Sequence, residues 1–320
     1  NLSLIRNPKG FNWDFSFNAS LVHNKIIKLP YNGNENNRQG GTQVFDPKTQ
    51  QVIWVGGYQE GHTMGDIYAY KQVKILSDWN EVNTMAGNYI DMIAGLYGPN
   101  VSDADKKKYG LTKPIEPGDV LWADLDGNHK IDQLDRVKVG NIYPKWTGGF
   151  SPTLSYKNVS LYGRFDFALG HTILNMVAMR SLGQSVGFKN IIKEGLKTWT
   201  EENTNTDLPK SYYDDSTNKK NIYRDTKGSD ITSVNDRSSR FYEKGDYLAL
   251  RELTLNWKLP VNWISKVGMT NASVYITGQN LFYITGYSGS SPEAPLTYPG
   301  VDAGRYPTPR TVLVGASVSF

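Results

Sequence analysis

The chain contains no cysteine among its 320 residues. This absence excludes disulfide bonds, thiolate metal sites and cysteine nucleophiles, and it leaves the redox compartment undecided. Long apolar runs are also missing, because no stretch approaches the roughly 20 residues that a membrane-spanning helix needs. The formal net charge of +4 is a small difference between 35 basic and 31 acidic residues, so no nucleic-acid partner is indicated.

The sequence also lacks the motifs of common enzyme classes. It has no HExxH zinc motif, no P-loop and no dinucleotide fingerprint. Residues 183–187 match G-x-S-x-G around Ser185, but that motif acts between a strand and a helix, with a histidine and an acid downstream. All four histidines precede Ser185. We therefore expect a small-residue loop there, and we predict that the protein is not an enzyme.

Aromatic residues make up 12% of the chain, with 20 tyrosines, and glycine occurs 31 times. A disordered chain lacks aromatic residues at this density. Tyr, Phe and Trp are enriched in strands, while glycine serves turns. This composition favours an ordered, all-β protein.

Strict alternation of apolar and polar residues recurs along the chain. Between Phe11 and Leu21 the odd positions are apolar and the even positions are polar, and the same pattern continues over 146–156, 159–169 and 312–320. A period of two is the period of a β-strand with one apolar and one polar face. The sequence therefore predicts long strands over these ranges.

A further strand, from Tyr247 to Trp257, alternates less regularly. Its lower half is regular, but Leu248 and Leu250 fall on the polar side and Arg251 on the apolar side, which predicts a mixed upper half. With Leu2–Arg6, Ala272–Ile284 and a weaker strand at Asp66–Ile75, the total is about eight strands.

Short and long connections alternate between these strands. The short ones lie near 7–10, 157–158 and 260–270, and the long ones near 30–60, 78–144, 174–243 and 286–306. Outer-membrane β-barrels have short periplasmic turns and long extracellular loops. The alternative is a soluble β-sandwich, which also alternates because one face packs on a core. Strand length, aromatic strand ends and very long loops favour the membrane barrel.

Several ordered motifs resemble those of SusC/RagA-type TonB-dependent outer-membrane transporters. The resemblance covers almost the whole chain, and its clearest stretches are Asp124–Arg136 with Gly140 and Tyr143–Lys145, Tyr247–Trp257, Gly278–Phe282, Thr285–Glu293, and Asp302–Pro307 with Arg310. It implies a plugged barrel of about 22 strands, a class of large outer-membrane transporter. We therefore predict that residues 1–320 form the C-terminal portion of such a barrel, and that the plug, the TonB box and the earlier strands are absent from this chain.

The resemblance further implies an integral outer-membrane protein, in contact with lipid, that imports oligomeric nutrients. Its partners would be a SusD-like surface lipoprotein and the TonB-ExbB-ExbD complex, the latter through the missing N-terminal part, and its cargo would be glycans or peptides. Two alternatives stay open at this point. One is an outer-membrane structural or surface-interaction barrel that serves adhesion or secretion assembly, and the other is a soluble β-sandwich carbohydrate-binding module.

One loop has the ligand spacing of a calcium site. Positions 1, 3, 5, 7, 9 and 12 of a calcium loop supply oxygen ligands, the seventh through its backbone carbonyl. Here these positions fall on Asp124, Asp126, Asn128, Lys130, Asp132 and Asp135. His129 replaces the glycine usual at position 6, and histidine is among the residues enriched at positive φ. The alternative is a cluster of Asx turns that caps a hairpin without metal.

The last residue, Phe320, ends the alternating strand 312–320. The resemblance implies that this terminal aromatic is the signal by which the barrel-insertion machinery recognises the protein. It could instead be one member of the aromatic girdle at the membrane interface. No cargo-binding residue is assigned from the sequence.

Overall fold

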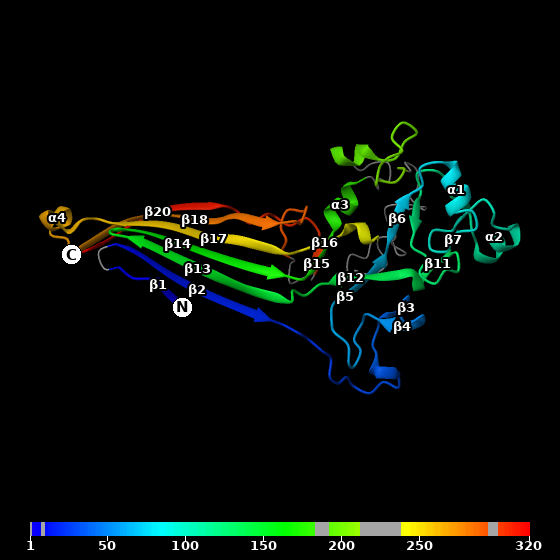
Figure 1. The fold of residues 1–320 in the computed structure, drawn as a ribbon, viewed down its shortest axis with the longest axis horizontal. Helices are drawn as coiled ribbons and strands as arrows, with labels where there is room; N and C mark the ends of the chain where they lie inside the picture. Colours follow the sequence, from blue (N-terminus) through cyan, green and yellow to red (C-terminus); the bar gives the residue numbers. More distant parts are fainter. Residues whose placement is uncertain (1, 8–9, 183–191, 212–237, 294–299) are drawn as a thin grey trace.

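The computed structural model describes residues 2–7, 10–182, 192–211, 238–293 and 300–320. Residues 183–187, which carry the G-x-S-x-G match, lie outside them. A long sheet occupies one half of the molecule, and a region of short strands, helices and loops occupies the other half (Figure 1). Both chain termini lie on the sheet side.

Seven antiparallel strands form the long sheet, in chain order with each strand paired to the next. They are β1 (Leu2–Ile5), β2 (Phe11–Leu21), β13 (Trp146–Tyr156), β14 (Val159–Leu169), β17 (Tyr247–Lys258), β18 (Asn271–Thr285) and β20 (Thr311–Ser319). The prediction of a mostly β, antiparallel architecture is confirmed for this sheet.

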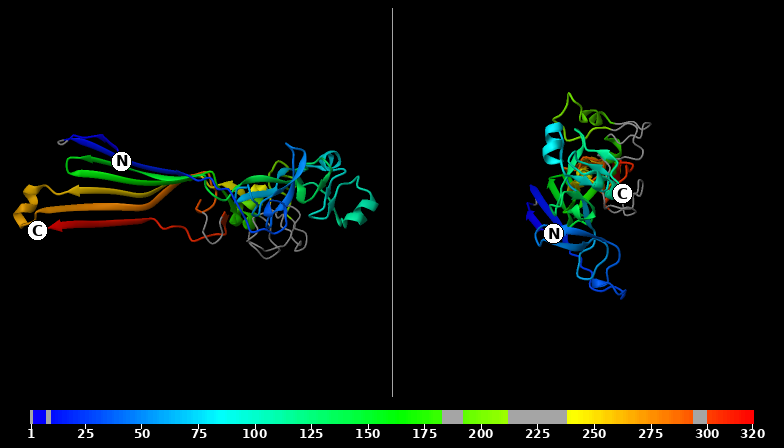
Figure 2. Two further views of the ribbon diagram at one scale, coloured as in Figure 1. Left: turned by 90° about the horizontal axis from the view of Figure 1, so that it is seen from below. Right: turned by 90° about the vertical axis from the view of Figure 1, so that its right-hand side faces the viewer.

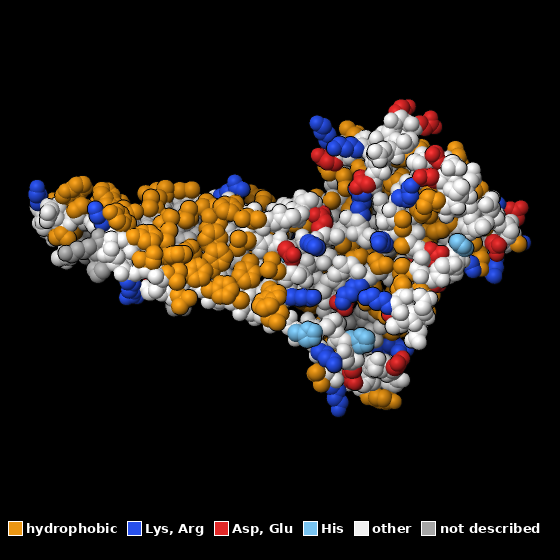
Figure 3. All heavy atoms as spheres, viewed as in Figure 1, with side chains coloured by type: hydrophobic (Ala, Val, Ile, Leu, Met, Phe, Trp, Pro, Cys, Tyr) orange, Lys and Arg blue, Asp and Glu red, His pale blue; other side chains and the backbone are white. Residues whose placement is uncertain are grey.

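The pairing register keeps apolar residues opposite apolar residues across the sheet. Phe17 of β2 lies opposite Phe150 of β13, which in turn lies opposite Phe165 of β14. Since directly opposed residues share a face, these rows form one continuous apolar face. That face is open to the surroundings: Phe17 is 58% exposed and Val314 of β20 is 78% exposed. Figure 3 shows hydrophobic side chains gathered over this half of the molecule.

A bulge in β17 explains why apolar and polar residues do not alternate regularly in the upper half of that strand. The register shifts by one residue at Arg251, so that Leu250 lies opposite Phe165 of the apolar face. The extra residue restores the alternation, because a shift of one residue exchanges the two faces. Leu248 and Leu250 therefore belong to the apolar face and Arg251 to the polar face, so the prediction of mixed faces is wrong.

The connections divide between the two ends of the sheet. The short connections between β1 and β2, at 157–158 and at 259–270 join strands at one end of the sheet. The last of these contains α4 (Val261–Ile264) and η5 (Ser265–Val267). The long connections all lie at the other end. The predicted loops 30–60 and 78–144 are parts of one connection over residues 22–145, between β2 and β13. The asymmetry itself is as predicted.

The connections 22–145, 170–246 and 286–310 make up the loop region, and their described residues form short elements only. Its strands are β3 (Thr42–Asp46), β4 (Gln51–Val55), β5 (Asp66–Tyr70), β6 (Gln72–Ile75), β7 (Ile90–Asp91), β8 (Leu96–Tyr97), β9 (Lys113–Pro114), β10 (Val120–Trp122), β11 (Lys130–Ile131), β12 (Arg136–Asn141), β15 (Thr172–Asn175), β16 (Tyr242–Lys244) and β19 (Val301–Asp302). Its helices are α1 (Trp79–Met85), α2 (Asp103–Tyr109), α3 (Met176–Ser181), η1 (Glu35–Asn37), η2 (Gln133–Asp135), η3 (Lys193–Lys197) and η4 (Ser239–Phe241).

The loop region has a hydrophobic core of its own. Tyr70, Leu76, Trp122 and Ile131 are almost fully buried in it, and Trp199 joins them from a different connection. The Trp199 indole also donates a hydrogen bond of 3.2 Å to the carbonyl of Ser77. Described residues of two long connections therefore pack against each other in this core.

The predicted membrane strand Asp66–Ile75 belongs to this loop region. It forms β5, which pairs with β12, and β6, which pairs with β10. Ile67, Ala69 and Tyr70 are at most 1% exposed, so this stretch packs in the core. Alternation of residue types cannot distinguish such a strand from a membrane strand, because both bury apolar side chains. The long sheet therefore has seven of the eight predicted strands.

The sheet is open at β1 and β20, which lie at its opposite edges (Figure 2). Each edge strand presents backbone groups that can pair with a further strand. Among the described residues, no helix combines the length and the apolar character needed to cross a membrane.

Candidate functional site

The predicted calcium loop lies in the loop region, between β10 and β12. Carboxylate oxygens of Asp124, Asp126 and Asp135 lie within 4.8 Å of one another. Asp124 and Asp126 are half-buried, whereas Asp135 is 1% exposed. Three of the predicted ligands therefore converge at one point, which is the arrangement that a hard cation needs.

Backbone hydrogen bonds fix the shape of this loop. Asp124 accepts from the backbone N–H groups of Gly127, at 2.9 Å, and His129, at 2.8 Å. Asp135 accepts from Leu125 and Asp132 at 2.8 and 2.9 Å. His129 has φ 59°, the conformation expected at position 6. The loop is thus held closed around the three carboxylates.

The other predicted ligands are engaged within the loop. Asn128 accepts from the Lys130 N–H at 2.7 Å and donates to Asp126 at 2.7 Å. Asp132 caps η2 by accepting from the Leu134 N–H at 2.7 Å. Neither side chain belongs to the group of three carboxylates, so the structure combines a carboxylate cluster with the Asx turns of the alternative interpretation.

The carboxylate cluster is electrostatically strained. Burial raises the pKa of Asp135 to about 6, although the two backbone N–H donors stabilise its ionised form and so oppose this rise. Burial and the neighbouring Asp124 also raise the pKa of Asp126. A raised pKa means that protonation stabilises the folded loop, and that this stabilisation is lost as the pH rises through about 6. A cation would offset the repulsion above that pH.

A second cluster lies on the polar face of the long sheet. The guanidinium of Arg251 bonds the carboxylate of Asp166, with 3.0 Å between Nη2 and Oδ2, and donates to the Tyr283 hydroxyl at 3.0 Å. Arg251 also pairs with Glu293, which follows β18. Asp14, Arg164, Asp166 and Glu252 all lie on this face.

The segment 286–293 returns over this polar face and is tied down along its length. Ser288 donates to Glu243 through its backbone at 2.8 Å, and the carbonyl of Pro292 lies 3.2 Å from Nε2 of His171. The Tyr287 hydroxyl donates to Asp302 at 2.8 Å. Residues of the Thr285–Glu293 motif thus fix the segment against the sheet and β15.

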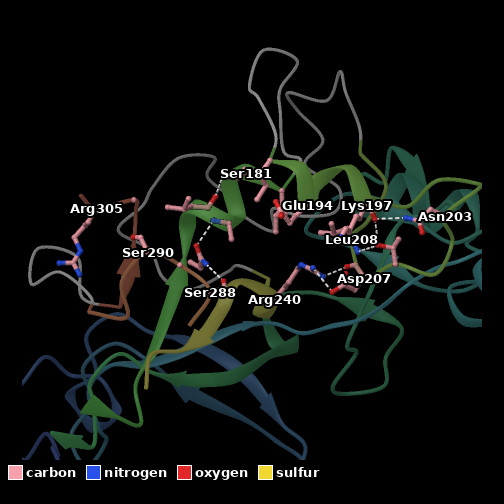
Figure 4. Close-up of a pocket in the computed structure, with 18 of the residues that line it drawn as sticks. Ser181, Glu194, Lys197, Asn203, Asp207, Leu208, Arg240, Ser288, Ser290 and Arg305 are labelled. Atoms are coloured by element: carbon pink, nitrogen blue, oxygen red, sulfur yellow. Dashed lines mark hydrogen bonds and ion pairs between the residues drawn. The ribbon is translucent and has the colours of Figure 1, made fainter. Parts of the chain in front are cut away.

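A cavity of about 1,020 Å³ opens beside α3. We call it the α3 cavity: its walls are α3, the segment 192–208, Ser288–Ser290 and Gly304–Arg305, with Arg240 between them (Figure 4). Ser288–Ser290 and Gly304–Arg305 belong to two of the sequence motifs, but no motif marks the cavity as a whole, because its walls come from separate connections. The bulge that places Arg251 was also missed, although the change of parity between Leu250 and Leu253 is a signal that could have revealed it.

Phe320 directly follows β20 and is 81% exposed. It continues the apolar face that contains Val314 and Val318, as the alternation predicted. Its position beside the edge strand is compatible with either role considered for it.

Comparison with known proteins identifies relatives over nearly the whole chain. The TonB-dependent receptor P3 of Formosa agariphila is 30% identical over 319 residues, which are 97% of this chain and 27% of that protein. The TonB-dependent receptor SusC of Bacteroides thetaiotaomicron is 24% identical over 98% of this chain and 25% of its own length. No protein-family model matches the chain.

The fold is similar to that of a solved peptide transporter. The RagAB peptide transporter superposes with a TM-score of 0.61 and 21% identity, over 99% of this chain and 28% of that one. The same importer in its open-open state gives a TM-score of 0.58. These relatives are named as receptors and as a peptide transporter and not as enzymes, which agrees with the prediction made from the sequence. This chain, which spans about a quarter of the length of these relatives, is therefore homologous to the SusC/RagA-type TonB-dependent receptors.

Proposed function

We propose that residues 1–320 form the C-terminal part of the barrel of a TonB-dependent outer-membrane importer. In this proposal the seven strands belong to a closed, plugged barrel of about 22 strands. The complete protein takes up oligomeric nutrients, either glycans or peptides, together with a SusD-like surface lipoprotein. TonB, ExbB and ExbD supply energy through a plug that belongs to the complete receptor. The loop region faces the cell exterior.

The exposed apolar face of the sheet carries this proposal. A contiguous apolar surface of this extent is rare on soluble proteins and marks contact with a membrane or a partner. Its two sides match a barrel wall, since lipid-facing residues alternate with residues that face a polar interior. The aromatic residues Phe11, Tyr156 and Trp257 lie at the end of the sheet that has the short connections. Aromatic residues at this position suit a girdle at the membrane interface.

Two other functions fit less well. A soluble sandwich would cover the apolar face with a second sheet, and in the described part of the chain no other sheet packs there. A barrel for adhesion or secretion assembly shares the membrane wall. The homology to TonB-dependent receptors, and the RagAB structure among the relatives, favour import with a lipoprotein partner.

Deletion of the complete gene tests import most clearly. We expect loss of growth on one oligomeric glycan or peptide source, with normal growth on its monomers. The wild-type receptor should also require detergent for extraction and should co-purify with a SusD-like lipoprotein. Unchanged growth on every oligomeric source would contradict import.

We propose that the acidic loop binds calcium through Asp124, Asp126 and Asp135. The strained carboxylates support this, since a cation would relieve their repulsion. We expect calorimetry on the full-length receptor at pH 7.5 to detect binding in the range of weak extracellular sites, about 0.1 to 1 mM. Asp126→Asn should weaken it at least tenfold. Asp103→Asn, an exposed carboxylate outside the loop, is the matched control. No binding at millimolar calcium would leave only the Asx-turn interpretation.

We also propose that Phe320 is part of the outer-membrane assembly signal. Phe320→Ala should reduce the amount of folded receptor in the outer membrane several-fold and leave unfolded protein in the periplasm. Heat-modifiable migration in gels measures the folded fraction. Val318→Ala removes apolar area two residues earlier on the same face, and it should have a much smaller effect if the terminal aromatic is recognised. Equal effects of the two substitutions would assign Phe320 to the girdle alone.

A further inference from the structure

The walls of the α3 cavity are held in place by polar contacts. Asn175 caps α3 by accepting from the Ala178 N–H at 2.9 Å, and it donates to Ser288 Oγ at 3.0 Å, so it joins two walls. Arg240 and Asp207 form an ion pair of 3.0 Å at the floor. A site whose walls are already fixed loses little conformational entropy when a ligand binds. The cavity is therefore preorganised.

The charged side chains of η3 are available to a ligand. Glu194 and Lys197 both line the cavity, and they are three residues apart in a 3₁₀-helix, where such positions lie on the same side. Both are exposed, and neither side chain forms a hydrogen bond or ion pair within the described part of the chain. An anionic and a cationic group thus line the cavity without an ion-pair partner among the described residues.

The cavity is elongated and has a third charge at its far end. Arg305 and Asn203 lie at opposite ends of the labelled lining, with Glu194 and Lys197 nearer to Asn203 (Figure 4). The walls also include apolar side chains such as Val177 and Leu182. The volume of about 1,020 Å³ is at the upper end of the range of ligand pockets, roughly 300–1,000 Å³. This shape suits a linear oligomer with both charged and apolar groups.

The lining argues against a neutral glycan. Protein sites for neutral sugars use aromatic rings that stack on the apolar faces of the sugar ring. None of the described residues that line the α3 cavity is aromatic, and the buried rings of Trp199 and Phe241 pack into hydrophobic clusters of the loop region instead. Charges of both signs match the ammonium, carboxylate and charged side chains of a peptide.

We infer that the α3 cavity binds a short peptide, with Glu194 facing an ammonium group and Lys197 and Arg305 facing carboxylates. This inference rests on the proposed import function and specifies its cargo class and a binding site. It predicts that the site discriminates by charge: peptides with blocked termini bind less tightly than peptides with free termini.

The test uses the purified full-length receptor in detergent. It is incubated with random hexapeptides that have free termini, with the same peptides capped at both ends, and with neutral six-unit oligosaccharides, and retained molecules are measured by mass spectrometry. We expect the free peptides to be retained most. Lys197→Glu should lower their retention about tenfold, the effect of one charged contact. Lys193→Glu, on the same helix but outside the lining, should leave retention unchanged.

The exchange Glu194→Lys with Lys197→Glu keeps both charges in the cavity, and it should recover part of the lost retention. Equal retention by Lys197→Glu and Lys193→Glu receptors, or retention of neutral oligosaccharides in place of peptides, would overturn the inference. Growth experiments separate the two proposals. If the receptor supports growth on an oligomer but Lys197→Glu does not change peptide retention, the import function stands and the proposed site does not. If peptide retention depends on these charges but deletion of the complete gene changes growth on no oligomer, the proposed site stands and the import function does not.

Discussion

Phe17→Arg is expected to prevent the receptor from reaching a stable state in the membrane. Phe17 lies in the middle of β2 on the exposed apolar face, opposite Phe150. An arginine at the midplane of a lipid-facing strand lowers the free energy of unfolding by about 2–4 kcal/mol. We expect a lower folded fraction in outer-membrane preparations and a lower midpoint of urea unfolding in lipid vesicles.

The neighbouring residue provides the control for this prediction. Asn18 is also exposed, but it lies on the polar face, so Asn18→Arg places the same side chain on the opposite side of the same strand. It should change the free energy of unfolding by no more than about 0.5 kcal/mol. If the two arginines cost the same, the apolar face does not contact lipid.

The second large effect is expected for Arg251→Ala. Removal of the guanidinium leaves the carboxylates of Asp166 and Glu293 close together without a cation. Breaking a buried ion pair by removing one partner costs about 3–5 kcal/mol, and partial exposure of this cluster places the expected loss nearer 2–3 kcal/mol. Urea unfolding of the full-length receptor in vesicles measures it.

Arg164→Ala is the matched control, since Arg164 lies on the same polar face of the adjacent strand and forms no ion pair among the described residues. It should be nearly neutral. Adding Glu293→Gln to Arg251→Ala should restore part of the stability, because it removes one unpaired carboxylate. A neutral Arg251→Ala would show that the 286–293 segment does not depend on this cluster.

The long strands could be predicted from the sequence because their two faces meet different surroundings. The alternation from Phe11 to Leu21, and again from Thr311 to Ser319, corresponds to residue-by-residue pairing in the sheet. The asymmetry of short and long connections could also be predicted from the sequence. These features depend on local sequence, since each strand residue faces one of two environments.

The loop region could not be predicted in the same way. Its core joins Tyr70, Trp122 and Trp199 from different connections, and no local pattern records which distant segments meet. The strand Asp66–Ile75 was therefore assigned to the membrane sheet. The α3 cavity was missed for the same reason. Glu194 and Arg305 lie far apart in the sequence, and only tertiary packing brings both into the lining of one cavity. The acidic loop was located because its ligands lie within twelve consecutive residues.

A cysteine scan of β2 in the full-length receptor tests the central claim that one face of the sheet contacts lipid and the other contacts water. Single cysteines at each position from Phe11 to Leu21 would carry a fluorescent label, and the natural absence of cysteine in these 320 residues leaves the segment free of background. We predict that labels at odd positions are quenched by brominated lipid and labels at even positions by iodide in water. Quenching without this two-residue period, or iodide quenching at every position, would contradict the account.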